Sequence, residues 1–153
     1  VMKVNDDQKK VMVKKILDHY YGDIKGKRVA IWGLAFKPNT DDIREAPALY
    51  NIEALLQEGA IVKCYDPEAM DNVQKIFKSK IIFCEDEYEA VEKADALMIM
   101  TEWPVFRTPD FELLENKLNN KAIFDGRNLY DVEEMKERGF TYSSIGRTFV
   151  NWT

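Results

Sequence analysis

An almost uninterrupted apolar run, VAIWGL at residues 29–34, limits the fold of this chain more than any other feature. A strand with so few polar positions is typical of a parallel sheet that helices cover on both faces. A helical pattern follows from Ala46 or Pro47 to Gly59, and a second strand pattern, IVKCYDP, ends at Pro67. Strand, helix and strand in this order predict a βαβ unit with a right-handed crossover.

The rest of the chain continues the same alternation. Strand patterns are IIFC, ALMIM, AIFDGRN with polar residues at its C-terminal end, and FTYSSIGR, and helical patterns cover residues 68–78, 85–95, 111–118 and 132–139. In the helix over residues 85–95 we expect Tyr88, Val91 and Ala94 to share one face. The fold class that follows is α/β: a Rossmann-like, open, mostly parallel sheet with helices on both faces, in three αβα layers.

A further helix is predicted ahead of the first strand. Residues 5–20 carry an apolar stripe at Val11, Val13, Ile16 and Leu17. The loop GDIKGK then ends this helix. A helix that leads into the first strand suits a connection to an upstream region, and a first residue other than Met points the same way.

Composition narrows the class of protein. The chain has 153 residues, of which 46% are hydrophobic, which is enough for one domain with its own core. Its formal net charge of −5 and pI near 5.0 argue against a general binder of nucleic-acid backbones, which needs clustered Lys and Arg. No run approaches the ~18 apolar residues of a membrane span, and the first residues lack the apolar core of a secretory signal. We therefore expect a cytoplasmic protein with neither nucleic acid nor membrane as a partner.

Metal and thiol chemistry have little support in the sequence. The two cysteines, Cys64 and Cys84, lack paired CxxC spacing, and His19 is the only histidine. We therefore expect no metal site. Cys64 alternates with apolar neighbours, so we interpret it as a small buried hydrophobe and assign a catalytic role to neither thiol.

Polar residues follow several of the predicted strands. In open α/β sheets, ligands bind beyond the carboxyl ends of the strands, so we expect these residues to share one rim. The rim residues are Phe36, Lys37, Arg44, Asp66, Thr101, Glu102, Trp103, Asp125, Arg127 and Asn128.

A dinucleotide is the first ligand to consider, because Gly33 opens the loop of a βαβ unit whose second strand ends at Asp66. The Rossmann fingerprint needs three glycines, whereas GLAFKPN has one and its loop is longer. A sugar nucleotide held by Lys37 and Arg127 fits better, because cations at strand ends can bind phosphates. An alternative stays open, in which Lys37, Arg44 and Arg127 only pair with Asp41, Asp42 and Asp125 to order the loops.

Five collinear segments carry a family resemblance: GLAFKPNTDDIREAP at 33–47, YDPEA at 65–69, ADALMIMTEWPVFR at 94–107, IFDGRNLYD at 123–131 and IGR at 145–147. They resemble the C-terminal domain of the UDP-glucose/GDP-mannose dehydrogenase family. Asn39, Thr40 and the TEW and DGRN segments resemble its UDP-glucose 6-dehydrogenase branch most. Residues 1–24, with Asn5 and Gln8, resemble the end of that family's long central helix, so we expect a connecting helix there and a UDP-sugar-binding domain at 25–153.

The resemblance implies a reaction as well as a fold. Family members oxidise the C6 alcohol of a UDP-sugar to a carboxylate and reduce two NAD+. An N-terminal Rossmann domain binds the NAD, and a cysteine near the middle of the enzyme forms a covalent thiohemiacetal; we expect both to be missing from this sequence. We therefore expect the chain alone to be inactive, and the full-length enzyme to be a homodimer.

The resemblance also assigns residues. It places Phe36, Lys37, Asn39, Thr40, Asp41, Asp42 and Arg127 in the UDP-sugar site. Arg44 would reach across a cleft toward the NAD pyrophosphate, and no residue of this chain is catalytic. Two alternatives remain: a stand-alone nucleotide-binding or assembly module, and a domain of a related UDP-N-acetylhexosamine or GDP-mannose dehydrogenase.

Overall fold

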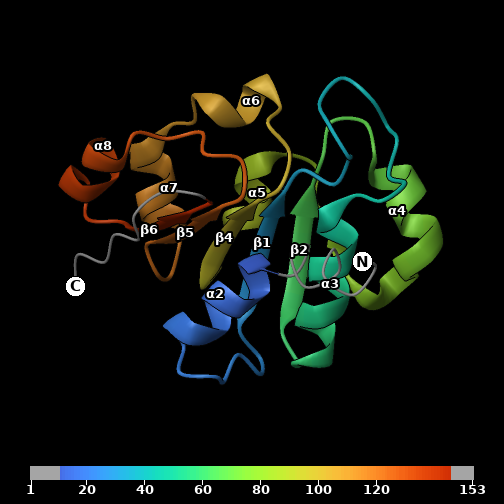
Figure 1. Cartoon of the computed structure of the whole chain (residues 1–153), viewed down its shortest axis with the longest axis horizontal. Coiled ribbons are helices and arrows are strands. Elements are labelled where there is room, and N and C mark those ends of the chain that lie inside the picture. The colour runs from blue at the N-terminus through green and yellow to red at the C-terminus, as the bar shows by residue number, and fades with distance from the viewer. Residues whose placement is uncertain (1–10, 146–153) are drawn as a thin grey trace.

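The computed structural model describes residues 11–145, and its centre is a six-stranded parallel sheet (Figure 1). The strands are β1 (Arg28–Trp32), β2 (Ile61–Tyr65), β3 (Ile82–Phe83), β4 (Ala96–Ile99), β5 (Ala122–Asp125) and β6 (Thr141–Ser144). They lie in the order β3-β2-β1-β4-β5-β6, and each neighbouring pair is parallel. The predicted open α/β sheet is confirmed, and it is wholly parallel within the described residues.

Helices cover both faces of this sheet. They are α2 (Val11–His19), α3 (Pro47–Gln57), α4 (Met70–Phe77), α5 (Glu87–Val91), α6 (Pro104–Arg107), α7 (Phe111–Lys117) and α8 (Val132–Glu137), and a short 3-10 turn, η1 (Lys78–Lys80), follows α4. One apolar cluster joins the sheet to α2, α3 and α4, and a second joins it to α5, α6, α7 and α8. These two clusters confirm the three predicted layers, because each contains side chains from alternate positions of the same strands.

The strand order creates a switch point beside β1. The chain runs from β1 through β2 to β3 at one edge, then returns to the other side of β1 to form β4. Trp32 at the end of β1 lies opposite Ile99 at the end of β4. Connections leave these two strands in opposite directions, which is where open α/β sheets form a ligand crevice. The loop after β1 and helix α6 lie at this end of the sheet, at the top of the view (Figure 1).

Helix α5 is shorter than predicted. It begins after Asp86, whose carboxylate accepts from the Glu89 amide at 2.7 Å, and it ends at Val91 rather than at residue 95. Lys93 has a φ of +58°, which ends the helical path so that the chain can enter β4. The correction leaves the apolar face intact, because Val91 and Ala94 are both buried.

Helix α2 confirms the leading helix from Val11 onward, with one change in its buried face. Met12 is buried with Val13 and Ile16, whereas Val11 and Leu17 are only partly buried. Asn5, Gln8 and Arg147 lie outside the described residues. None of the helices between residues 11 and 145 is long and apolar enough to span a bilayer.

Candidate functional site

The turn after β1 is pressed against the end of β4. Gly33 has a φ of +97°, and a Cβ atom there would lie 2.5 Å from the Thr101 Cβ and 2.6 Å from the Thr101 nitrogen. The Thr101 hydroxyl donates to the Ala35 carbonyl at 2.7 Å. The glycine therefore permits close packing of two chain segments, which is a different use from the approach of a pyrophosphate to the backbone.

Asp66, at the end of β2, is fully buried and is bonded within the protein through both carboxylate oxygens. Oδ2 accepts from Trp103 Nε1 at 3.1 Å and from the amides of Leu34 and Ala35 at 2.7 and 3.1 Å. Oδ1 accepts from the amides of Glu68 and Ala69, both at 2.8 Å. The prediction that Asp66 forms part of a ligand rim is therefore wrong: it anchors three loops and leaves no oxygen for a ribose hydroxyl. Together with Gly33, it shows that a Rossmann-type dinucleotide site does not fit the residues of this chain.

The loop between β1 and α3 is ordered by its own hydrogen bonds. The Phe36 amide donates to the Asp42 carbonyl at 2.8 Å, and the Asp42 amide donates to the Thr40 hydroxyl at 3.1 Å. Asn72 of α4 donates to the Asp41 carbonyl at 2.9 Å, which ties the loop to that helix. Within the loop, Asn39 has a φ of +66°, a conformation that asparagine tolerates better than most residues. These internal hydrogen bonds give the loop a defined shape.

Two cations on this loop differ in their surroundings. Arg44 forms a two-pronged contact with Asp42, from Nε to Oδ1 and from Nη2 to Oδ2, both at 3.0 Å. Hydrogen bonds from the Arg44 side chain and backbone lower the pKa of Asp42 to about 2. Lys37 is exposed and forms no hydrogen bond or close ion pair within the described residues, and its charge adds to the lowering of the Asp42 pKa from a longer distance. The loop-ordering alternative is therefore confirmed for the pair of Arg44 with Asp42, whereas Lys37 acts on Asp42 through its charge without a direct contact.

The loop after β5 presents Arg127. Asp125 is fully buried and accepts from the amides of Arg127 and Leu129, at 2.8 and 2.7 Å, and from the Tyr142 hydroxyl at 2.6 Å. The Arg127 guanidinium does not pair with Asp125. Its Nη2 instead lies 2.8 Å from Oε2 of Glu102, which follows β4. Asp125 thus anchors the backbone of the loop, and Glu102 pairs with the Arg127 side chain.

Thr101, Glu102 and Trp103, the TEW segment, join the ends of four strands. Thr101 contacts Ala35 after β1, Trp103 contacts Asp66 after β2, and Glu102 contacts Arg127 after β5. The structure therefore brings the TEW segment, the start of the β1 loop and Arg127 together at one end of the sheet. Thr101 and Trp103 serve the packing of this region, while Lys37, Arg44 and Arg127 reach its surface.

Comparison with known proteins agrees with this geometry. Residues 30–132 match the model of the UDP-glucose/GDP-mannose dehydrogenase family, UDP binding domain. The chain belongs to this family. The matched range contains the β1 loop, the TEW segment and Arg127, and so contains the described candidate site.

Individual relatives that match the chain carry the name UDP-glucose 6-dehydrogenase. It is 44% identical over 144 residues to a UDP-glucose 6-dehydrogenase of Rhizobium meliloti and 41% identical over 153 residues to the UDP-glucose 6-dehydrogenase TuaD of Bacillus subtilis. These alignments cover 94% and 100% of this chain but 33% of each relative. The chain therefore spans about a third of the length of these dehydrogenases.

Two solved structures show the same fold. A UDP-glucose dehydrogenase of Pyrobaculum islandicum superposes with a TM-score of 0.71 at 29% identity, over 84% of this chain and 28% of that one. An NDP-N-acetyl-D-galactosaminuronic acid dehydrogenase of Methanosarcina mazei superposes with a TM-score of 0.76 at 24% identity, over 93% of this chain and 29% of that one. The second likeness concerns the fold alone.

The two thiols of this family member lie in its core. Cys64 and Cys84 are both buried, and they belong to the apolar clusters on opposite faces of the sheet. Burial raises the pKa of the Cys84 thiol to about 11 and raises that of Cys64 well above its usual range. The interpretation of Cys64 as a small buried hydrophobe is confirmed, and burial with a raised pKa makes the thiolate of either cysteine scarce at neutral pH.

We expect both thiols to resist a disulfide reagent such as DTNB in the folded chain at pH 8, with reaction at least ~100-fold slower than for the unfolded chain. The reason is that the reactive thiolate is scarce and the sulfur atoms are covered. Absorbance of the released thiol measures the rate, and the chain in denaturant, where both cysteines should react, is the control. Fast reaction of either thiol in the folded chain would contradict the burial argument.

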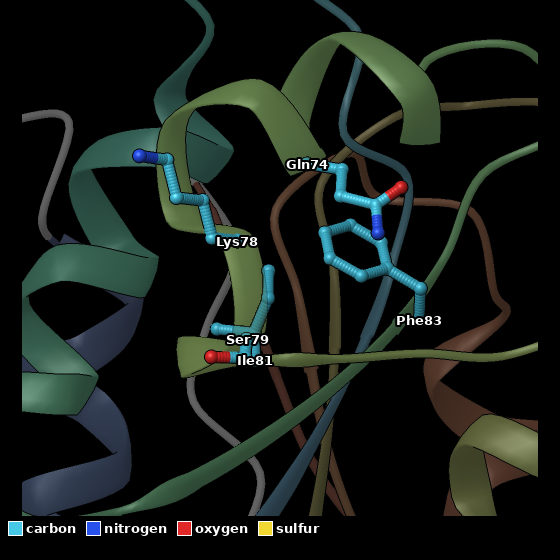
Figure 2. A pocket seen from close by; sticks show the side chains of 5 residues that line it. All are labelled: Gln74, Lys78, Ser79, Ile81 and Phe83. Atoms are coloured by element: carbon cyan, nitrogen blue, oxygen red, sulfur yellow. The ribbon is translucent and has the colours of Figure 1, made fainter.

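A pocket of about 480 Å³ lies away from this site, between the end of α4, η1 and the edge strand β3 (Figure 2). It is lined by Gln74, Lys78, Ser79, Ile81 and Phe83. Figure 2 shows the Gln74 side chain reaching toward the Phe83 ring while the Lys78 side chain points away from it. None of the candidate site residues lines this pocket, so the candidate site rests on the rim contacts.

Sequence reasoning placed Glu102 on the rim but gave it no role. The signal was available, because Glu102 follows a predicted strand directly and precedes Trp103 and Pro104. Its partner, Arg127, could not be predicted from the spacing of residues along the chain.

Among residues 11–145, no three His, Cys, Asp or Glu side chains are grouped to hold a metal ion.

Proposed function

We propose that this chain is the UDP-sugar-binding domain of an NAD-dependent UDP-glucose 6-dehydrogenase. Residues 25–153 form that domain, and residues 1–24, which include helix α2, connect it to an upstream catalytic region. The observation that carries the proposal is Lys37: an exposed ammonium that forms no hydrogen bond or close ion pair within the described residues, on a loop held by internal hydrogen bonds. The match to a UDP binding domain supports it.

The proposed roles follow from the chemistry of each side chain. Lys37 and Arg127 bind the phosphates, since an ammonium and a guanidinium form strong charge-assisted hydrogen bonds with phosphate oxygens. Phe36, 47% exposed, offers its ring to the apolar side of the nucleotide or sugar. The segment Asn39–Asp42 supplies further polar contacts through its fixed backbone and side chains. No residue of this chain takes a catalytic role.

NAD belongs to the proposal as the cofactor of the complete enzyme. When bound, it accepts the electrons removed from the C6 alcohol. Gly33 and Asp66 do not fit a Rossmann-type dinucleotide site, so we assign NAD binding mainly to an N-terminal domain. Arg44 can contribute to the cofactor pyrophosphate, because 88% of its side chain is exposed even while it pairs with Asp42. We therefore propose that the chain alone is inactive, and a homodimeric enzyme in the cytoplasm stays a prediction.

UDP titration of this chain tests the proposed function. We expect amide chemical shifts to move in the loop after β1 and around Arg127, more strongly with UDP than with GDP or NAD+. Lys37→Ala and Arg127→Ala should each weaken UDP binding about tenfold or more, because each removes a charge-assisted contact. Lys80→Ala, which removes an exposed lysine before β3, at the opposite end of the strands, is the control and should leave the affinity unchanged. Unchanged affinity in both Lys37→Ala and Arg127→Ala would overturn the residue assignment.

A further inference from the structure

The contact between Glu102 and Arg127 leaves one carboxylate oxygen without a donor. Oε2 of Glu102 lies 2.8 Å from Nη2 of Arg127, and the two side chains are 24% and 35% exposed. Oε1 of Glu102 is buried and has no hydrogen-bond partner within the described residues. A buried polar atom without a partner lowers the stability of the protein. The burial of Oε1 therefore needs an explanation other than stability.

Glu102 nevertheless carries a negative charge at neutral pH. Burial raises its pKa, but the hydrogen bond from Arg127, the nearby backbone amide of Glu102 itself, and the charges of Arg127 and Arg107 outweigh that effect and lower the pKa overall. An ionised carboxylate attracts a guanidinium more strongly than a neutral acid does. The contact with Arg127 is thus a charged one.

The geometry also leaves most of the guanidinium free. Arginine has five N–H donors, and within the described residues Glu102 engages Arg127 only through Nη2. The remaining donors are enough for a two-pronged contact with a phosphate. Glu102 therefore restrains Arg127 without occupying all of its binding capacity.

Both ends of this contact are held by the fold. The Arg127 backbone is fixed by its bond to buried Asp125. Glu102 is fixed through its neighbours, because Thr101 bonds to Ala35 and Trp103 bonds to Asp66. A carboxylate on such a rigid segment can restrict a long arginine side chain that would otherwise sample many rotamers.

We propose that Glu102 is a positioning residue, which holds the Arg127 guanidinium ready for a phosphate group of the ligand at the expense of the stability of the free protein. This inference rests on the proposed function, in which Arg127 binds the phosphates of a UDP-sugar. It adds to that function the residue that orders the arginine before the ligand arrives.

The test compares Glu102→Ala with a matched control, Glu92→Ala. Glu92 pairs with Lys117 at the same 2.8 Å but at the opposite end of the sheet, and its side chain is more exposed, at 45% against 24% for Glu102. We expect Glu102→Ala to weaken UDP binding about threefold to tenfold, because the arginine must be immobilised on binding. Its unfolding midpoint in urea should be unchanged or raised. Glu92→Ala should leave UDP binding unchanged.

Two further readouts separate positioning from a general structural effect. Glu102→Gln, which keeps an acceptor oxygen, should restore part of the affinity, and Glu102→Ala should have no further effect in an Arg127→Ala background. The Arg127 Nε–H signal in an NMR spectrum should be distinct in the unaltered chain and averaged in Glu102→Ala. An unchanged UDP affinity and an unchanged Arg127 signal in Glu102→Ala would overturn the inference while leaving the proposed function intact. Absence of UDP binding by the unaltered chain would overturn both.

Discussion

Replacing Asp66 with alanine is expected to lower the free energy of unfolding by about 3–5 kcal/mol, because several buried donors lose their acceptor at once. The carboxylate accepts from four backbone amides and from the Trp103 indole, and its side chain is fully buried. Each unsatisfied buried donor costs ~1–3 kcal/mol, and water that enters the space left by the side chain recovers part of that sum. Urea unfolding measures the change.

Asp66→Asn and Asp71→Ala complete this experiment. Asparagine keeps one acceptor oxygen. The free energy of unfolding of Asp66→Asn should therefore lie between that of the unaltered chain and that of Asp66→Ala. Asp71 is exposed in the first turn of α4, and its replacement should change stability by less than ~1 kcal/mol. Stability of Asp66→Ala within that same range would show that the loops at the ends of β1, β2 and β4 are held by other contacts.

Gly33→Ala should also be strongly destabilising, by about 3–5 kcal/mol, because strain and overlap act together. The φ of +97° is one that alanine rarely adopts, and the new Cβ would lie 2.6 Å from the backbone nitrogen of Thr101. A backbone atom cannot move aside as the end of a flexible side chain can. The ends of β1 and β4 must therefore separate, and UDP binding should weaken together with stability.

Gly22→Ala isolates the conformational part of this effect. Gly22 has a similar φ of +85°, but a Cβ atom there would meet nothing within 4 Å. We expect a loss of about 1 kcal/mol in urea unfolding, which is the strain alone. Similar losses for the two variants would mean that the contact between Gly33 and Thr101 contributes little.

The candidate site was predicted in part. The topological rule for open α/β sheets placed the ends of β1, β4 and β5 at one edge, and the structure brings Ala35, Thr101, Glu102 and Arg127 together there. The same rule could not separate residues that reach the surface from those that hold the loops. Asp66 was placed on the rim for its position after a strand, yet it lies inside, bonded to the protein.

The sequence by itself determined the order and type of the elements and the end of the sheet at which the candidate site is proposed. Apolar runs, helical periodicity and turn residues act over short distances along the chain, so they can be read without a structure. Only the tertiary structure decided the partners at the rim. The contacts from Glu102 to Arg127, from Trp103 to Asp66 and from Thr101 to Ala35 join residues 25, 37 and 66 positions apart. Such partners depend on strand order and register, which the local pattern leaves open.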